Sequence, residues 1–413
     1  MKKIVILLLI TAVLALGVYT SWRSRNGSTD FDAYYYAAKR IVMHEPIYSD
    51  RPGVAPYIYP PLFACLMTPL TFFSIGIASF IWYLASVAMF ALSLILCSRM
   101  IFPYRSIREI YEDSPLMPGI VFIAVTSGVF IDCISLLQAD ILILFSVVSG
   151  LYLFVRGRKT LGAAFLAMAI SIKMIPALFL VYFIIKRQFK FALAMIVFLL
   201  LFTLALPSMV IGVKATRQGL ARWNDTMLMR FTSSSASNVM MGPMFNPVNQ
   251  SVTASVSRWL VKNDDDLSAW KTRFFKYPAL FRDMGGPLTR RAALNLARAM
   301  VYLAVGVSLL VCIFGSAGAG NKARNYEFSI IFIASLLSNP LLRTSHLAFL
   351  IFPALFLLSQ ISRQGRFFYC VFILAGISYL LVADKGFRIM GSGTMSLFLF
   401  WILLVSSRKK LNL

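Results

Sequence analysis

Residues 190–211 have the sequence KFALAMIVFLLLFTLALPSMVI, with no charged side chain after Lys190. A run of about 20 apolar residues is long enough to cross the hydrocarbon core of a bilayer as an α-helix. Because the run is continuously apolar and does not alternate, it predicts a transmembrane helix and not a strand of a β-barrel. Similar runs lie at about 4–20, 75–97, 117–134, 140–155, 160–172, 174–186, 293–315, 326–341, 345–361, 367–383 and 393–406.

The composition agrees with an all-α polytopic membrane protein of about twelve transmembrane helices. Hydrophobic residues make up 59% of the 413-residue chain and charged residues 14%, whereas a soluble domain has about 25% charged residues. Forty Lys and Arg against sixteen Asp and Glu give a formal net charge of +24. Nucleic-acid binding is one interpretation of such a charge. The basic residues gather at helix ends, however, which is typical of membrane proteins. If the N-terminus is cytoplasmic, every predicted inside segment is basic, as the positive-inside rule requires. We therefore expect both termini in the cytoplasm.

The predicted topology is one integral membrane domain over residues 1–413 with two long extracytoplasmic loops, at about 20–73 and 212–292. The N-terminal apolar run resembles a signal peptide but lacks a small-x-small cleavage site before Ser21, so we expect an uncleaved first helix. In the first loop, residues 31–43 predict an amphipathic helix on the membrane surface with Asp30 or Thr29 as its N-cap. Residues 60–73 predict an interfacial segment.

Polar residues that interrupt the apolar pattern gather on the predicted extracytoplasmic side, and polar groups at membrane depth are costly and often functional. The predicted cytoplasmic side carries arginines and lysines and little else. We therefore expect function on the outer face. The five cysteines form no CxxC pair, so neither a disulfide framework nor a zinc site is indicated. The polar residues of the outer face are Asp30, Asp32, Asp132, Gln138, Asp140, Lys173, Asn249, Gln250, Ser251, Arg343 and His346.

The first loop carries the most specific motif, Asp30-Phe31-x-x-Tyr34 followed by Tyr48 and Tyr59-Pro60-Pro61. With this motif, most of the chain resembles glycosyltransferase family 87, whose membrane enzymes of the C-type (GT-C) fold include polyprenyl-phosphate-mannose-dependent mannosyltransferases. Four later positions extend the resemblance. They are Gln138 of a Gly-Gln motif in which Leu137 replaces glycine, Lys173-x-x-Pro176, Asn249-Gln250-Ser251, and Pro340 with His346-Leu347, where Arg343 replaces a tryptophan and Ser345 a first histidine.

The resemblance implies transfer of a sugar, a hexose such as mannose, from a polyprenyl-phosphate donor to a hydroxyl of a glycolipid or glycan. The reaction would occur at the periplasmic face of the inner (plasma) membrane and invert the anomeric carbon. In the family the aspartate that opens the first-loop motif is the general base, and it falls on Asp30. The alternative for Asp30 is a simple helix cap. If the helix begins at Asp30, Asp32 points about 200° away, so we expect a solvated or supporting carboxylate there.

The remaining candidates would bind the substrates. Lys173, at the junction of the two short spans 160–172 and 174–186, and Arg343 would stabilise the leaving phosphate; the alternatives are a snorkelling lysine and an interfacial anchor. His346 matches an active-site histidine, with a polar helix start as its alternative. No metal or other cofactor is indicated. The residues expected to contact the sugars or acceptor are Tyr34, Tyr59, Gln138, Asn249, Gln250 and Ser251.

A multi-pass transporter or lipid flippase is the competing hypothesis. Twelve helices, interrupted helices and an intramembrane lysine would all fit it. It predicts polar groups near the midplane and on both sides of the membrane, whereas the polar residues here cluster on one predicted side. The sequence therefore favours an enzyme.

Overall fold

A computed structural model describes residues 2–49, 51–103, 116–225, 246, 248–262, 285–314, 320–361, 366–383, 387–388 and 390–408. Within these ranges the secondary structure is helical, and the only β pairing is an isolated bridge between Val261 and Leu288. Much of the second predicted outer loop, residues 226–245 and 263–284, lies outside the described residues.

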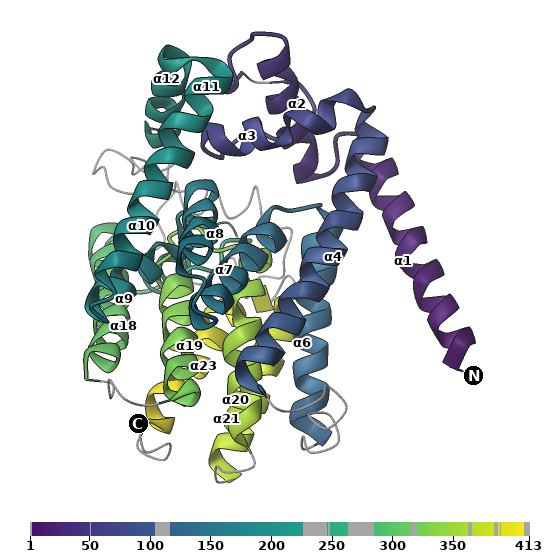
Figure 1. Ribbon diagram of the computed structural model, residues 1–413. Helices are drawn as coiled ribbons and strands as arrows, with labels where there is room; N and C mark the ends of the chain where they lie inside the picture. Colours follow the sequence, from purple (N-terminus) through teal and green to yellow (C-terminus); the bar gives the residue numbers. More distant parts are fainter. Residues whose placement is uncertain are drawn as a thin grey trace. The chain divides into compact units, whose positions relative to one another are not determined.

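The chain divides into two compact units, of which the first comprises residues 1–96, 130–174 and 190–229. It holds most of α4 (Ile75–Ile101) and the end of α6 (Leu116–Ser135). Its other elements, coloured purple to teal in Figure 1, are α1 (Lys2–Arg25), α2 (Asp30–Val42), α3 (Pro61–Met67), η1 (Thr68–Phe72), α7 (Asp140–Val155), α8 (Lys159–Ile172), α10 (Phe189–Leu200), the π-helical η3 (Leu201–Ala205), α11 (Leu206–Ile211) and α12 (Val213–Trp223).

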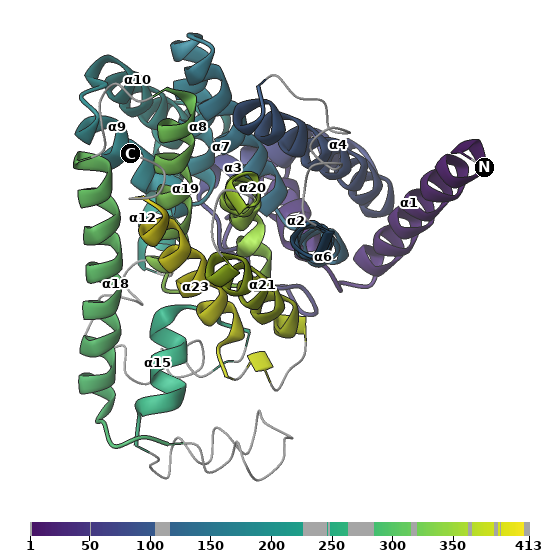
Figure 2. The same ribbon diagram turned by 90° about the horizontal axis from the view of Figure 1, so that it is seen from below.

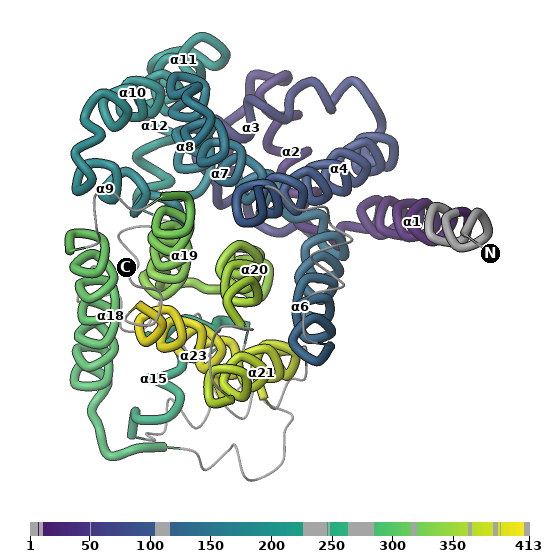
Figure 3. Tube along the Cα trace, turned by 60° about the horizontal axis from the view of Figure 1, so that its bottom comes forward, coloured from purple at the N-terminus to yellow at the C-terminus, as the bar shows by residue number. Residues whose placement is uncertain are grey.

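The second unit comprises residues 97–129, 175–189 and 230–413. Within it α19 is the central helix, since every side chain from Asn325 to Leu337 is buried. Helices α21 and α23 pack side by side, as Figures 2 and 3 show. Its elements are η2 (Ile175–Ala177), α9 (Leu178–Ile185), α15 (Val252–Leu260), α18 (Arg290–Ile313), α19 (Asn321–Leu337), η6 (Thr344–Leu350), α20 (Ile351–Gln360), α21 (Arg366–Leu380), η8 (Leu381–Ala383) and α23 (Ser392–Ser407).

Each of the twelve apolar ranges predicted from the sequence lies mostly in helix among the described residues, although α19 ends at Leu337, before the predicted end at residue 341. By length and composition, four helical segments among the described residues can cross a membrane: Ile75–Ile101, Leu116–Ser135, Phe189–Ile211 and Arg290–Ile313. Seven other apolar helical segments of the described residues have only 10–17 residues. The described part of the chain is thus helical with segments that can cross a membrane, while twelve crossings, the GT-C fold and the single membrane domain stay predictions.

The first predicted loop contains the expected amphipathic helix, α2, and the stretch after Pro60 is helical as α3 and η1. Thr29 is the N-cap of α2, with extended backbone, and Asp32 completes a capping box by accepting a hydrogen bond from the Thr29 backbone N–H. A capping box satisfies donors that the first turn of a helix leaves unpaired. The buried face of α2 includes Phe31, Tyr34 and Ala38, so packing and capping together fix where α2 begins.

Helices α7 and α8 form an antiparallel hairpin whose turn includes Gly157 at φ 79°. Their backbones approach closely at Gly150 and Gly162, where an added Cβ on Gly150 would come within 2.9 Å of the Gly162 carbonyl oxygen. Only glycine permits so close an approach. The hairpin therefore holds the start of α7, at Asp140, and the end of α8, before Lys173, at the same end.

The long segment Phe189–Ile211 is interrupted by the π-helical turn Leu201–Ala205. The interruption lies just before Pro207. Proline lacks a backbone N–H and its ring collides with the carbonyl four residues earlier, so the preceding turn widens.

A buried polar cluster joins α9, α18 and α19. Lys186 Nζ lies 2.7 Å from Glu327 Oε1 and also donates to the Cys312 carbonyl, while the Tyr182 hydroxyl donates to Glu327 Oε2 at 2.8 Å. Nearby, Asn325 is buried and donates to the Met100 carbonyl. The expectation that the predicted cytoplasmic side holds little besides Lys and Arg is therefore wrong. Hydropathy missed Glu327 because it lies among apolar neighbours on a buried helix.

Candidate active site

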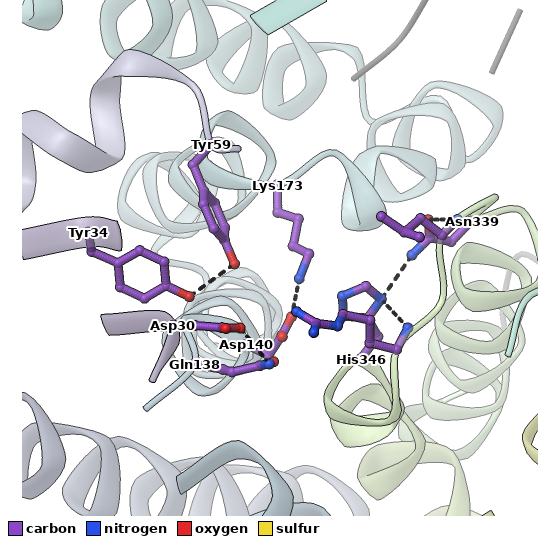
Figure 4. Close-up of polar contacts among 10 residues, drawn as sticks. Asp30, Tyr34, Tyr59, Gln138, Asp140, Lys173, Asn339 and His346 are labelled. Carbon is purple, nitrogen blue, oxygen red and sulfur yellow. Dashed lines mark hydrogen bonds and ion pairs between the residues drawn. The ribbon is translucent and has the colours of Figure 1, made fainter. Parts of the chain in front are cut away.

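Asp30, the proposed base, is the first residue of α2 and is held by the turn that joins α6 to α7. Its backbone N–H donates to the Leu136 carbonyl at 3.0 Å. Its Oδ2 accepts a hydrogen bond from Gln138 Nε2 at 2.7 Å, which Figure 4 shows. Since Thr29 is the N-cap, Asp30 is not required to cap α2.

The turn that holds Asp30 has a left-handed residue at its centre. Leu137 has φ 53° and is fully buried. Its N–H donates to Ile134 O and the Gln138 N–H donates to Cys133 O, the paired bonds of a Schellman motif. The Leu137 carbonyl accepts from Trp82 Nε1 at 3.0 Å. The position where the family motif has glycine thus keeps the backbone geometry that glycine favours.

Asp32 has a different environment from Asp30. It is fully buried and accepts hydrogen bonds from the Ser24 hydroxyl and from the Thr29 N–H and hydroxyl. Burial raises the pKa of the Asp32 carboxyl above its usual 3.8, and the bonds from Ser24 and Thr29 oppose that rise. Of the two alternatives expected for Asp32, the solvated carboxylate is excluded and the supporting carboxylate agrees with the structure, because the capping box buries the side chain.

Lys173 follows α8 in extended conformation and forms an ion pair with Asp140, the first residue of α7. The Lys173 Nζ–Asp140 Oδ1 distance is 2.7 Å, and the exposed fractions of the two side chains are 19% and 0%. The start of a helix favours an acidic residue such as Asp140. Lys173 Nζ also lies 5.8 Å from the centroid of the Tyr59 ring, within the range of a cation–π interaction.

Tyr34 and Tyr59 complete the polar cluster of the first unit. Their hydroxyl oxygens lie 3.2 Å apart and point toward each other in Figure 4. Burial raises the pKa of both phenols, so both remain protonated donors at neutral pH. The Tyr48 hydroxyl donates to the Tyr59 carbonyl at 2.8 Å, which explains its place in the motif. Five predicted site residues, Asp30, Tyr34, Tyr59, Gln138 and Lys173, thus come together with Asp140.

In the second unit, the side chains of Asn249 and Ser251 are buried and form hydrogen bonds with backbone groups. Asn249 Oδ1 accepts from the N–H groups of Leu342 and Ser251 at 3.0 Å each, and Asn249 Nδ2 donates to the Pro340 carbonyl at 3.1 Å. The Ser251 hydroxyl caps α15 by accepting from the Ala254 N–H. These contacts link the start of α15 to the segment that precedes η6.

Gln250 forms a second set of backbone contacts. Its N–H donates to the Leu342 carbonyl at 2.6 Å, its Nε2 donates to the Arg388 carbonyl, and its Oε1 accepts from the Gly393 N–H. The tripeptide Asn249-Gln250-Ser251 therefore joins three segments of the second unit. Sugar binding by these residues stays a prediction, and their buried contacts support a role in fixing the segment that leads to His346.

His346 is buried in η6 and accepts hydrogen bonds on one ring nitrogen. The Arg343 backbone N–H donates to His346 Nδ1 at 3.2 Å, and Asn339 Nδ2 lies 3.1 Å from the same atom (Figure 4). Because Nδ1 accepts, the proton of a neutral imidazole resides on Nε2. In this tautomer Nε2 of His346 acts as a hydrogen-bond donor and not as a proton acceptor.

Three residues of these clusters were absent from the predicted site. The sequence places Asp140 on the predicted outer face, but only the α7–α8 hairpin brings it to Lys173. Asn339 lies beside His346 after the end of α19. Arg258 is buried and donates to the Asn249 carbonyl at 2.8 Å, and burial lowers its pKa to about 9. No sequence signal pointed to Arg258, because its burial on α15, which requires internal acceptors, is seen only in the structure.

The cluster around Asp30 has the groups that a displacement at a sugar carbon needs. It provides an oriented carboxylate, two phenol donors and a lysine whose charge can face an anion. Among the described residues, no group of three His, Cys, Asp or Glu could hold a metal ion.

Comparison with models of protein families gives a match. The sequence model of glycosyltransferase family 87 matches residues 57–353. No curated protein and no solved structure matches the chain.

Proposed function

Because the chain belongs to glycosyltransferase family 87 and is a membrane glycosyltransferase, we propose that a polyprenyl-phosphate-linked sugar is its donor. The sugar, a hexose such as mannose, passes to a hydroxyl group of a glycolipid or glycan. The reaction takes place on the periplasmic face of the inner membrane. The basic helix ends in the sequence support this orientation.

The observation that carries the mechanism is the fixed position of Asp30. Its carboxylate accepts from Gln138 and its backbone N–H is bound to Leu136. In the proposed reaction Asp30 removes the proton of the acceptor hydroxyl as the oxygen attacks the anomeric carbon. The bond from that carbon to the phosphate oxygen breaks, and the electron pair leaves with the phosphate. A single displacement inverts the anomeric carbon.

The leaving phosphate monoester carries more negative charge than the diester, so cations beside it lower the barrier. We assign this role to Lys173, whose ion pair with Asp140 keeps a positive charge close to the tyrosine pair. Tyr34 and Tyr59 are protonated and can donate to sugar or acceptor oxygens.

His346 and Arg343 are the proposed donor-binding residues of the second unit. The Nε2–H of His346 would donate to a phosphate or sugar oxygen, and the Arg343 guanidinium would bind phosphate. Asn249, Gln250 and Ser251 would fix the backbone before these residues through their bonds to Pro340 and Leu342.

Sugar transfer in proteoliposomes from a panel of polyprenyl-phosphate sugars tests the proposal. Asp30→Asn should lower kcat by about 10²–10⁴-fold, the usual contribution of a general base. Asp225→Asn, at an exposed acid after α12, is the matched control and should retain activity. Full activity of Asp30→Asn would remove Asp30 as the base. Uptake of solute without transfer would contradict the proposed reaction.

A further inference from the structure

We infer that the turn Leu136–Gln138 is a positioning element for the base, with Gln138 acting through Asp30 and not on a substrate. This inference rests on the proposed role of Asp30. It replaces the sequence expectation that Gln138 contacts a sugar or the acceptor.

The turn contacts Asp30 at two separate atoms. The Leu136 carbonyl binds the backbone N–H at 3.0 Å, and Gln138 Nε2 binds Oδ2 at 2.7 Å. The first contact fixes where the chain enters α2, and the second fixes the rotation of the carboxyl group. A base that must meet a hydroxyl proton at hydrogen-bond distance requires both.

The turn itself is rigid enough to serve this purpose. Its Schellman bonds close the end of α6, and Trp82 Nε1 binds the Leu137 carbonyl. Leu137 is fully buried and Gln138 is 3% exposed. An amide buried to this extent and already bonded to Asp30 is placed to orient the carboxylate.

The hydrogen bond also has an electrostatic effect. A donor to a carboxylate favours its charged form, and Gln138 Nε2 is such a donor to Asp30 Oδ2. Asp32, Tyr34 and Tyr59 also interact electrostatically with Asp30, and they are the same in wild type and in the Gln138 variants. Removal of the amide N–H should raise the pKa of Asp30 and leave its carboxyl group free to rotate. A residue that only bound substrate would instead change KM and leave the pH dependence of kcat unaltered.

The test compares Gln138→Ala and the isosteric Gln138→Glu with Gln218→Ala, at an exposed position of α12. We expect Gln138→Ala to lower kcat by about 10–100-fold and to move the acid limb of its pH profile up by about 1 pH unit. Gln138→Glu should move the limb further in the same direction, because a second carboxylate disfavours ionisation of Asp30. Gln218→Ala should match the wild type.

An unchanged acid limb in both Gln138 variants, or a change confined to KM, would overturn the inference. Gln138→Glu keeps the size and shape of glutamine, so it provides the profile if the alanine variant folds poorly. Asp30→Asn separates the two proposals. If it is inactive while the Gln138 variants behave as wild type, the positioning role fails and the base remains; if it is fully active, the proposed base fails.

Discussion

Two lysine–carboxylate pairs of this chain are almost identical in geometry and different in surroundings. Lys173–Asp140 and Lys186–Glu327 both have an N–O distance of 2.7 Å, with lysine side chains 19% and 20% exposed. Glu327 uses its second oxygen to accept from Tyr182, and Lys186 also binds the Cys312 carbonyl. Lys173 instead lies against the Tyr59 ring, in the cluster that contains Asp30.

The comparison shows that the geometry of an ion pair does not reveal its role. The Lys186 pair joins helices α9, α18 and α19 through four groups that satisfy one another, which is typical of a structural contact. The Lys173 pair adjoins phenol donors and a second carboxylate, so a phosphate could use the charge of its lysine. The neighbouring groups therefore distinguish the structural pair from the pair proposed to act in catalysis.

Removal of each lysine is the strongest test of this comparison. Lys173→Met should lower kcat by about 10²–10³-fold, as expected for loss of a group that stabilises charge in the transition state. Lys186→Met removes the ion-pair partner of the buried Glu327, so it should lower the free energy of unfolding by about 3–5 kcal/mol. Transfer assays and thermal unfolding in detergent measure the two effects.

The two variants serve as controls for each other. Turnover per folded molecule of Lys186→Met should stay close to that of the wild type. Equal losses of turnover in both variants would contradict the distinction between a catalytic and a structural pair.

The turns beside the two pairs allow a smaller test. Leu137 precedes Asp140 and Arg187 follows Lys186, and both have left-handed φ values in Schellman turns. Glycine relieves this conformation by about 1 kcal/mol, but burial of a leucine contributes about 1.5–3 kcal/mol. Leu137→Gly should therefore destabilise by about 0.5–2 kcal/mol. Arg187→Gly, at an exposed position, should be neutral or slightly stabilising.

Thermal unfolding of the two glycine variants measures these changes in stability. Stabilisation by Leu137→Gly would mean that backbone strain outweighs packing in the turn that holds Asp30. The family glycine would then be the better residue even in this chain.

Replacement of Asp32 should give the smallest change in stability. This carboxylate is buried with hydroxyl and N–H donors and without a lysine. Its folded pKa is raised above 3.8 by burial. Its contribution to stability is therefore fully present below pH 3.8 and is lost as pH rises through the folded pKa. The difference in Tm between wild type and Asp32→Asn should accordingly shrink as pH rises from about 4 to 7. A difference that grows with pH would show that the hydrogen bonds outweigh burial.

The sequence was sufficient for the helices and for one group of site residues. Apolar runs locate helices because a backbone buried in lipid or protein must satisfy its own hydrogen bonds. The twelve predicted ranges lie mostly in helix among the described residues. The first-loop motif located Asp30, Tyr34 and Tyr59 together. Motif spacing works there because α2 and the following loop are close in the chain.

Contacts between distant segments were beyond the reach of the sequence. Nothing in its pattern pairs Asp140 with Lys173 or Glu327 with Lys186, since each pair requires packed helices. The burial of Asp32 was missed because a capping box depends on the φ and ψ of Thr29. A single glutamate lowers the mean hydropathy of a long apolar helix only slightly, so its position does not stand out.

The close contact of α7 with α8 restricts how this chain can change in length. These helices have 16 and 14 residues, and Gly150 meets Gly162 between them. A deletion of one residue within either helix would rotate everything beyond it by about 100° and shift it by about 1.5 Å. Asp140 and Lys173 lie at the open end of the hairpin, so such a deletion would separate them. Insertions and deletions should therefore be tolerated at the Gly157 turn, and within the helices only when both change together by whole turns.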